Sequence, residues 1–341
     1  MNRPATIAKT LLAATLLAAT PAARAQDLYL SQFHEAPMLR SPALAGLFSG
    51  DHRIQGVYRN QWNSISFPYQ TGSLNLEHKR TLFDSDDYLT LGLQMLYDRA
   101  GTVALTSGHL LPVVNYHKSV SDRRSSYLSL GFSGGVVTRR LDRSKVTTDI
   151  QFDGTGYNGS LPDGEAFTAG YAFFDAGVGL SYNATLGPDE RHVYFLGAAL
   201  HHLNRPVNAF YRNIRHLPKW VFSAGLRLEI SDIAHLTLHG DHVLQAPYRQ
   251  TVFGGSYARK LGDAGDAAFI HLGLFGRLQD ALIPTVKLDI QPVRIGFSYD
   301  VTVGDAADIA RARGGFELSL SYAGFSDRDN SARYVVRCPK F

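Results

Sequence analysis

The feature that most constrains this chain is an alternation of apolar and polar residues that recurs along most of its length. In 73–77 the sequence reads SLNLE, and in 316–322 it reads FELSLSY. Successive side chains of a β-strand point to opposite faces, so these segments are typical of strands that separate two environments. About fourteen such segments of roughly ten residues occur, which suits a closed antiparallel barrel. They lie near 53–59, 70–79, 88–97, 109–119, 126–138, 171–183, 191–203, 218–230, 234–244, 250–261, 267–276, 281–290, 293–301 and 314–323.

The alternation alone leaves open whether the apolar face meets lipid or a dry core. Full charges stand in mid-strand on the polar face, for example Glu77, Lys287 and Glu317, and a wide barrel could hold them in its lumen. Past the N-terminus there is no apolar run of about 18 residues, which excludes a helical membrane protein. We therefore expect an all-β transmembrane barrel whose apolar side chains face the acyl chains of the lipid.

Connection lengths support the same architecture, because outer-membrane barrels have short periplasmic turns and longer outer loops. The long connections alternate with short ones such as 231–233, 262–266 and 291–292. Counted from the first predicted strand, the long connections are all odd-numbered. Connections nine and eleven are exceptions, since they are odd-numbered but short. The longest loop contains Phe152, Tyr157 and Phe167 and is our first candidate for partner contact. The long connections are 60–69, 98–108, 139–170, 204–217 and 302–313.

The N-terminus has the pattern of a secretory signal peptide. A basic start precedes the apolar stretch Thr10–Thr20, and Ala23-Arg24-Ala25 matches an A-x-A cleavage site, so we expect cleavage after Ala25. Loss of this segment leaves 31 of the 34 basic residues beside 30 acidic ones, which gives no electrostatic basis for binding nucleic acid. The predicted organisation is a signal peptide (1–25), an irregular segment that plugs the lumen or meets periplasmic partners (26–50), an outer-membrane barrel (51–323) and a periplasmic tail (324–341).

The hairpin around Gln291-Pro292 predicts a specific register. It sets Asp289 opposite Arg294 as an ion pair in the lumen, with apolar pairs on either side of it. Pro292 fits a two-residue mirror-image turn poorly, so we expect a somewhat wider loop.

No catalytic, cofactor-binding or metal site is predicted. His235 and His239 share a strand face but His242 points the other way, and His201 and His202 are expected to point oppositely. Glycine-rich pieces lack the helix and Lys-Ser/Thr pair of a phosphate loop, and no G-x-S-x-G is present. Cys338 is the single cysteine, which excludes an internal disulfide; it is either buried and unpaired or makes an intermolecular contact.

Five segments, in order, resemble the PorP/SprF family. They are the opening YLSQF with its later SPALAG, then YRNQW on the first strand and loop, the mid-chain GAALHHLNRP, the closing strand GGFELSLSY and the tail RCPKF. Two positions depart from the family pattern: Ala36 or Ser41 stands where Asn usually precedes Pro, and Leu44 replaces an aromatic. The residues that carry the resemblance are Ser31, Gln32, Pro37, Pro42, Gly46, Tyr58, Arg59, Gln61, Trp62, His202, Pro206, Gly315, Phe316, Glu317, Cys338, Pro339 and Phe341.

The resemblance implies a non-enzymatic outer-membrane component of the type IX secretion system. Such a protein assists the export or surface attachment of proteins that carry a type IX C-terminal signal, often large adhesins of gliding bacteria. The implied partners are outer-membrane lipid, the cargo protein and other secretion components at the periplasmic face, with no cofactor. Two alternatives stay open: a transporter or porin for small or hydrophobic solutes, and an outer-membrane lipid hydrolase.

Overall fold

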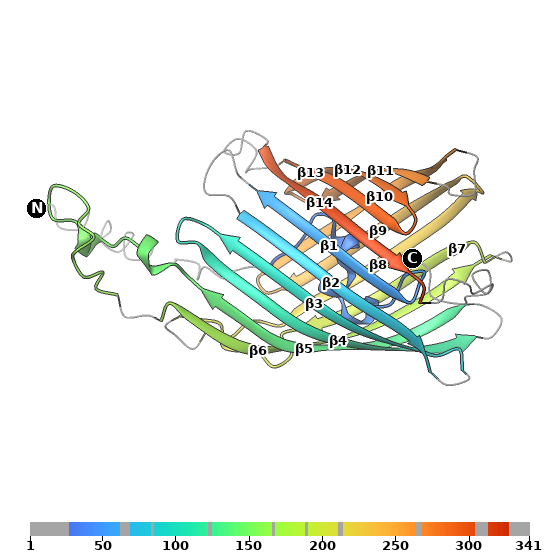
Figure 1. The fold of residues 1–341 in the computed structure, drawn as a ribbon, viewed down its shortest axis with the longest axis horizontal. Coiled ribbons are helices and arrows are strands. Elements are labelled where there is room, and N and C mark those ends of the chain that lie inside the picture. Colours follow the sequence, from blue (N-terminus) through green and yellow to red (C-terminus); the bar gives the residue numbers. More distant parts are fainter. Residues whose placement is uncertain are drawn as a thin grey trace, which may run out of the picture.

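The computed structural model is a closed barrel of fourteen antiparallel strands (Figure 1). It describes residues 27–61, 69–82, 85–121, 125–165, 168–187, 190–210, 214–262, 268–303 and 313–326. Each strand pairs with its neighbours in sequence, and β1 closes the barrel by pairing with β14. The strands are β1(His52–Gln61), β2(Tyr69–Thr81), β3(Tyr88–Ala100), β4(Leu105–Ser121), β5(Ser126–Arg140), β6(Gly170–Leu186), β7(His192–His201), β8(Lys219–Ser231), β9(Ala234–Gln245), β10(Tyr248–Leu261), β11(Ala268–Arg277), β12(Ala281–Ile290), β13(Val293–Thr302) and β14(Arg313–Gly324).

The predicted fold class is confirmed. The prediction that apolar side chains face outward and charged ones face the lumen is confirmed as well. Phe297, Leu318 and Leu320 are 42%, 45% and 57% exposed on the outside of the barrel. Glu317, which lies between Phe316 and Leu318, is 1% exposed on the inside. Apolar side chains therefore cover the outer surface while ionised ones fill the lumen, the arrangement that a bilayer requires of a spanning strand.

Among the described residues, no helix combines the length and the apolar character needed to cross a membrane.

The β12–β13 hairpin has the predicted register. Ile290 lies opposite Val293, and Asp289 lies opposite Arg294 with 3.0 Å between Oδ2 and Nε. The expectation of a wider loop is wrong, because β12 ends at Ile290 and β13 begins at Val293, which leaves a two-residue turn. The peptide bond between Gln291 and Pro292 in this turn is cis.

Residues 27–50 lie inside the barrel, and we call this segment the plug (Figure 1). It contains three short helical turns, η1(Phe33–Glu35), α2(Pro37–Arg40) and η2(Pro42–Leu44). Its first residue contacts the loop before β8, whereas Gly50 and Asp51 contact Gly324 at the opposite end of the barrel. Since short turns mark the periplasmic end, the plug runs from the outer mouth to the periplasmic mouth.

Glycines in the wall allow the plug to approach it closely. A Cβ added at Gly131 of β5 would lie 2.4 Å from the carbonyl carbon of Pro42, and one added at Gly179 of β6 would lie 2.3 Å from Ser41 Oγ. Only glycine permits backbone or small polar atoms at these positions. The absence of side chains at these two wall positions thus lets the plug backbone lie directly against β5 and β6.

The described part of the connection between β5 and β6, residues 141–165 and 168–169, extends beyond the barrel, and we call it the arm (Figure 1). It carries the turns η3(Arg143–Lys145) and η4(Asp149–Gln151), and Arg143 Nε binds Asp163 Oδ2 at 2.8 Å across it. Ile150, Phe152 and Tyr157 are 63%, 61% and 57% exposed. The arm thus presents apolar side chains on the outer side of the barrel.

Candidate functional site: the plugged lumen

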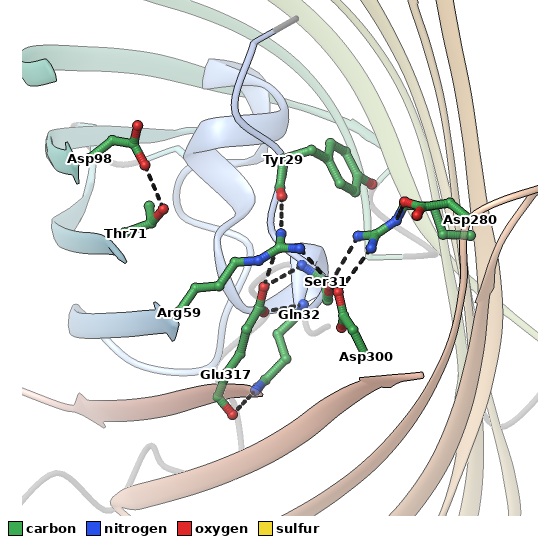
Figure 2. A network of polar contacts seen from close by, with 10 residues as sticks. Tyr29, Ser31, Gln32, Arg59, Thr71, Asp98, Asp280, Asp300 and Glu317 are labelled. Carbon is green, nitrogen blue, oxygen red and sulfur yellow. Dashed lines mark hydrogen bonds and ion pairs between the residues drawn. The ribbon is translucent and has the colours of Figure 1, made fainter. Parts of the chain in front are cut away.

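A buried carboxylate of β14 binds the plug backbone at two consecutive residues. Glu317 accepts the backbone N–H of Ser31 at 2.7 Å on Oε1 and that of Gln32 at 2.6 Å on Oε2 (Figure 2). The Gln32 amide donates to the Glu317 carbonyl at 2.9 Å, and Ser319 Oγ donates to Gln32 Oε1 at 2.7 Å. Bonds from backbone N–H to an ionised carboxylate are among the stronger hydrogen bonds in proteins. Glu317 therefore fixes both the position and the direction of the plug backbone.

Two arginines and a second buried carboxylate extend this network, and Arg277 also binds the half-exposed Asp280. Arg59 of β1 lies 3.3 Å from Glu317 and 3.0 Å from Asp300, and it donates to the Tyr29 carbonyl (Figure 2). Arg277 of β11 binds Asp300 at 2.9 Å and Ser31 Oγ at 3.0 Å. Asp300 and Glu317 are each matched by guanidinium groups, so the buried charges balance. A group of this kind is stable as a unit, and removal of one member leaves an uncompensated charge.

A second anchor lies on the other side of the plug. Arg40 at the end of α2 forms a two-point bond with Asp241 of β9, whose Oδ2 lies 2.7 Å from Arg40 Nε. The same guanidinium lies 5.0 Å from the ring centre of Phe33 and 5.5 Å from that of Phe195. Both charged side chains are almost fully buried. This pair therefore fixes α2 against β9 at a distance from the Glu317 network.

The periplasmic end of the plug is held mainly through its backbone. Gly46, with φ of +85°, donates its N–H to Glu77 Oε2 at 2.7 Å, and Lys79 Nζ binds the Phe48 carbonyl at 2.7 Å. The Asn115 amide of β4 donates to the carbonyls of Ala43 and Ala45 at 2.9 and 2.8 Å. The plug has little regular structure of its own, so wall side chains satisfy the backbone groups that a helix or sheet would otherwise pair.

At the outer mouth, the first described residue of the plug joins a histidine cluster. His202 Nε2 lies 2.6 Å from Asp27 Oδ2, and its Nδ1 lies 2.9 Å from Asp175 of β6. Lys219 Nζ lies 2.8 Å from the same Asp27 oxygen, and the His216 ring stacks on His202 at 4.2 Å. Burial disfavours the charged form of His202, but Asp27 and Asp175 outweigh it and raise the pKa of His202 to about 9. Burial lowers the pKa of His216 to about 4, which leaves this ring neutral.

The expectation that His201 and His202 point oppositely is wrong. β7 ends at His201, two residues earlier than predicted, and His202 has φ of +57°. His202 therefore leaves the strand alternation and turns inward, where it is 6% exposed. His201 also faces the lumen, with Nε2 3.0 Å from the Arg40 carbonyl.

Of the motif residues that the structure describes, most lie on the plug or where it meets the wall. Ser31, Gln32, Arg59 and Glu317 come from three separate motifs and meet in one network (Figure 2). Pro37 begins α2, and Pro42 begins η2.

The mid-chain motif shapes the loop before β8. The Pro206 carbonyl accepts the His216 N–H at 2.8 Å, which closes this loop beside His202.

The remaining motif residues lie away from these networks or outside the described part of the chain. Tyr58 and Phe316 contact one another on the outer surface, with ring centres 6.3 Å apart. Gly315 lies against the backbone at the end of β1 near Gln61. Trp62, Cys338, Pro339 and Phe341 fall outside the described residues.

Several residues of these networks lie outside the five segments that resemble the family. Asp241, Arg277 and Asp300 face inward from the outer halves of their strands, and Asp27 and Arg40 come from the irregular segment. A lone charge on the polar face of a strand is the only signal the sequence offers for the first three. Their partners in the plug lie about 200 or more residues away, so the sequence pattern alone could not place these side chains against the plug.

Comparison with known proteins agrees with the motif assignment. A family model described as type IX secretion system membrane protein PorP/SprF matches residues 22–322. No protein with a curated description gives a significant match.

Solved structures similar to the chain include outer-membrane barrels of low identity. The chain is similar to the toluene transporter TbuX of Ralstonia pickettii, with 11% identity, coverage of 84% of this chain and 92% of TbuX, and a TM-score of 0.48. For CdiB from Acinetobacter baumannii the identity is 8%, the coverage 80% of this chain and 60% of CdiB, and the TM-score 0.44. The chain thus spans less than two thirds of the length of CdiB.

Proposed function

Because the chain belongs to the PorP/SprF family of type IX secretion system membrane proteins, we propose that it acts in the outer membrane as a sealed, non-enzymatic secretion component. After removal of residues 1–25, it assists surface attachment of cargo bearing a type IX C-terminal signal, such as a large adhesin. It does so through its outer loops, while the cargo itself passes elsewhere. The periplasmic face contacts other components of the secretion system.

The observation that carries this proposal is the plug. Glu317, Asp300 and Asp241 hold it in the outer half of the lumen, and Glu77 and Asn115 hold it further toward the periplasm. A polypeptide in transit would have to displace all of these buried contacts. Attachment at the outer surface needs no such displacement, and the arm of 141–169 offers exposed apolar side chains for it.

Replacement of Ile150, Phe152 and Tyr157 by serine is expected to release cargo from the cell surface. Apolar anchors usually supply most of the binding energy of an interface, so the cell-bound fraction of cargo should fall several-fold with a matching rise in the medium. Quantitative blotting of cells and medium measures both fractions. Ser160→Ala on the same arm is the control. Unchanged attachment in the triple variant, with normal barrel abundance, would contradict a docking role for the arm.

A second candidate function, transport of a small apolar solute, is favoured by one pocket. It lies between the plug and the wall formed by β8–β10, and its lining includes Leu28, Leu39, Val221, Val243 and Tyr248. Pockets with apolar walls and a few polar groups are the usual form of small-ligand sites.

A measurement of ion conductance through the barrel distinguishes the sealed secretion component from the solute transporter. The intact protein in a planar bilayer is expected to stay closed, whereas a variant lacking residues 27–47 should show stepwise openings because the polar lumen then fills with water. Heat-dependent gel migration shows whether the shortened barrel is folded. Steady conductance by the intact protein would favour the transporter.

The hydrolase alternative finds little support in the described part of the chain. His117 Nδ1 lies 2.7 Å from Ser129 Oγ, as in a catalytic pair, but its Nε2 faces Thr90 Oγ1 at 3.0 Å. The ring is 0% exposed beneath the plug, so a lipid could not reach it. We therefore assign no catalytic step to this pair.

A further inference from the structure

We propose that Asp27, His202 and His216 form a binding site for a divalent transition metal ion of the zinc class at the outer mouth of the barrel. This inference is independent of the proposed function, because it rests on side-chain geometry alone. The three residues come from distant parts of the chain, two of them from the loop before β8 and one from the plug.

The first argument is the spacing of the donor atoms. One ligand atom from each residue lies within 4.8 Å of the others. With bonds of about 2.1 Å, ligand atoms around tetrahedral zinc are about 3.4 Å apart. Asp27 Oδ2 lies 2.6 Å from His202 Nε2, and Oδ1 lies 3.9 Å from His216 Nδ1. These separations involve the two different oxygens of one carboxylate, so a small movement of that carboxylate toward His216, which lengthens the first and shortens the second, would let Asp27 hold an ion between the two rings.

The second argument is the support behind the donors. Asp175 accepts from His202 Nδ1, which directs Nε2 toward Asp27. A carboxylate behind a histidine in this way is the usual arrangement around protein-bound metals, since it fixes the ring and makes it a better donor. His216 is held by its backbone bond to Pro206 and by stacking on His202. Both rings are therefore oriented before an ion arrives.

The groups around Asp27 set how tightly a cation would bind. Asp27 borders the pocket between the plug and β8–β10. Lys219 already occupies one oxygen of Asp27. A bound ion would replace the proton between His202 Nε2 and Asp27, whereas the Nδ1 proton would stay hydrogen-bonded to Asp175, and the ion would repel Lys219. The lysine therefore weakens the site, and its removal should strengthen binding.

The test is calorimetric titration of Zn²⁺ into the purified, metal-free barrel in detergent, together with its unfolding temperature. We expect one ion per chain and a higher unfolding temperature at saturation. His216→Gln should abolish saturable binding, and Asp175→Asn should weaken it by roughly 10- to 100-fold. Lys219→Gln should bind more tightly than the unmodified protein. His78→Gln, at an exposed position near the periplasmic end of β2, should bind as the unmodified protein does.

Two results would overturn the site. One is the absence of saturable binding to the unmodified protein. The other is binding that His216→Gln leaves unchanged, which would indicate coordination elsewhere. If the histidine variant fails to fold, Lys219→Gln still decides the matter, because binding that is equal or weaker in that variant contradicts the proposed position of the ion.

Discussion

Glu317→Ala is expected to destabilise the plugged barrel by about 3–5 kcal/mol, the range found when one partner of a buried charge group is removed. The substitution leaves the N–H groups of Ser31 and Gln32 without their acceptor. It also leaves the two arginines of the network with Asp300 as their shared buried carboxylate, because Arg59 loses its contact at 3.3 Å. The midpoint of the heat-induced mobility shift on gels, or a denaturant titration in lipid, measures this loss.

The plug should loosen before the barrel unfolds, since the β14 ladder does not depend on the Glu317 side chain. We therefore expect the variant to show intermittent conductance at temperatures where the barrel is intact. Glu229→Ala is the matched control, because this carboxylate pairs with Arg227 while both remain partly exposed and such pairs contribute about 0–1 kcal/mol. Equal stability losses in the two variants would show that the network around Glu317 is not what holds the plug.

The barrel could be predicted from the sequence because each strand carries its own signal. Alternation in a segment such as 314–323 assigns every side chain to lipid or lumen, and the β12–β13 register followed from one hairpin. These are local relationships, and the bilayer enforces them independently on each strand. The strand bounds accordingly agree with the structure to within a few residues.

The path of the plug could not be obtained in the same way. Residues 27–50 show no periodic pattern of apolar and polar residues. The reason is that they contact inward-facing side chains from many strands instead of packing against one flat surface. Motifs indicated Ser31, Arg59 and Glu317 one at a time without showing that they touch. The turn of His202 into the lumen depends on a left-handed backbone conformation, and the alternation rule cannot predict such an exception.

Single substitutions in the Arg40–Asp241 pair are expected to be far more damaging than the double substitution. Arg40→Met leaves Asp241 buried with Tyr29 as a neutral partner, and Asp241→Leu leaves the guanidinium among Phe33 and Phe195. Each should cost about 3–5 kcal/mol, because the remaining charge is buried without its partner. The double variant places apolar side chains in both positions, and such replacement of a whole buried pair is often nearly neutral.

Comparison of the double variant with the unmodified protein distinguishes two roles for the Arg40–Asp241 ion pair. If the double variant is as stable as the unmodified protein and stays closed in bilayers, packing alone retains the plug and the ion pair contributes little net stability. If the double variant is stable but conducts, the pair serves to fix the plug in one position, because apolar contacts allow several arrangements where a two-point bond allows one. A double variant as unstable as either single variant would contradict the assignment of Arg40 and Asp241 as one coupled unit.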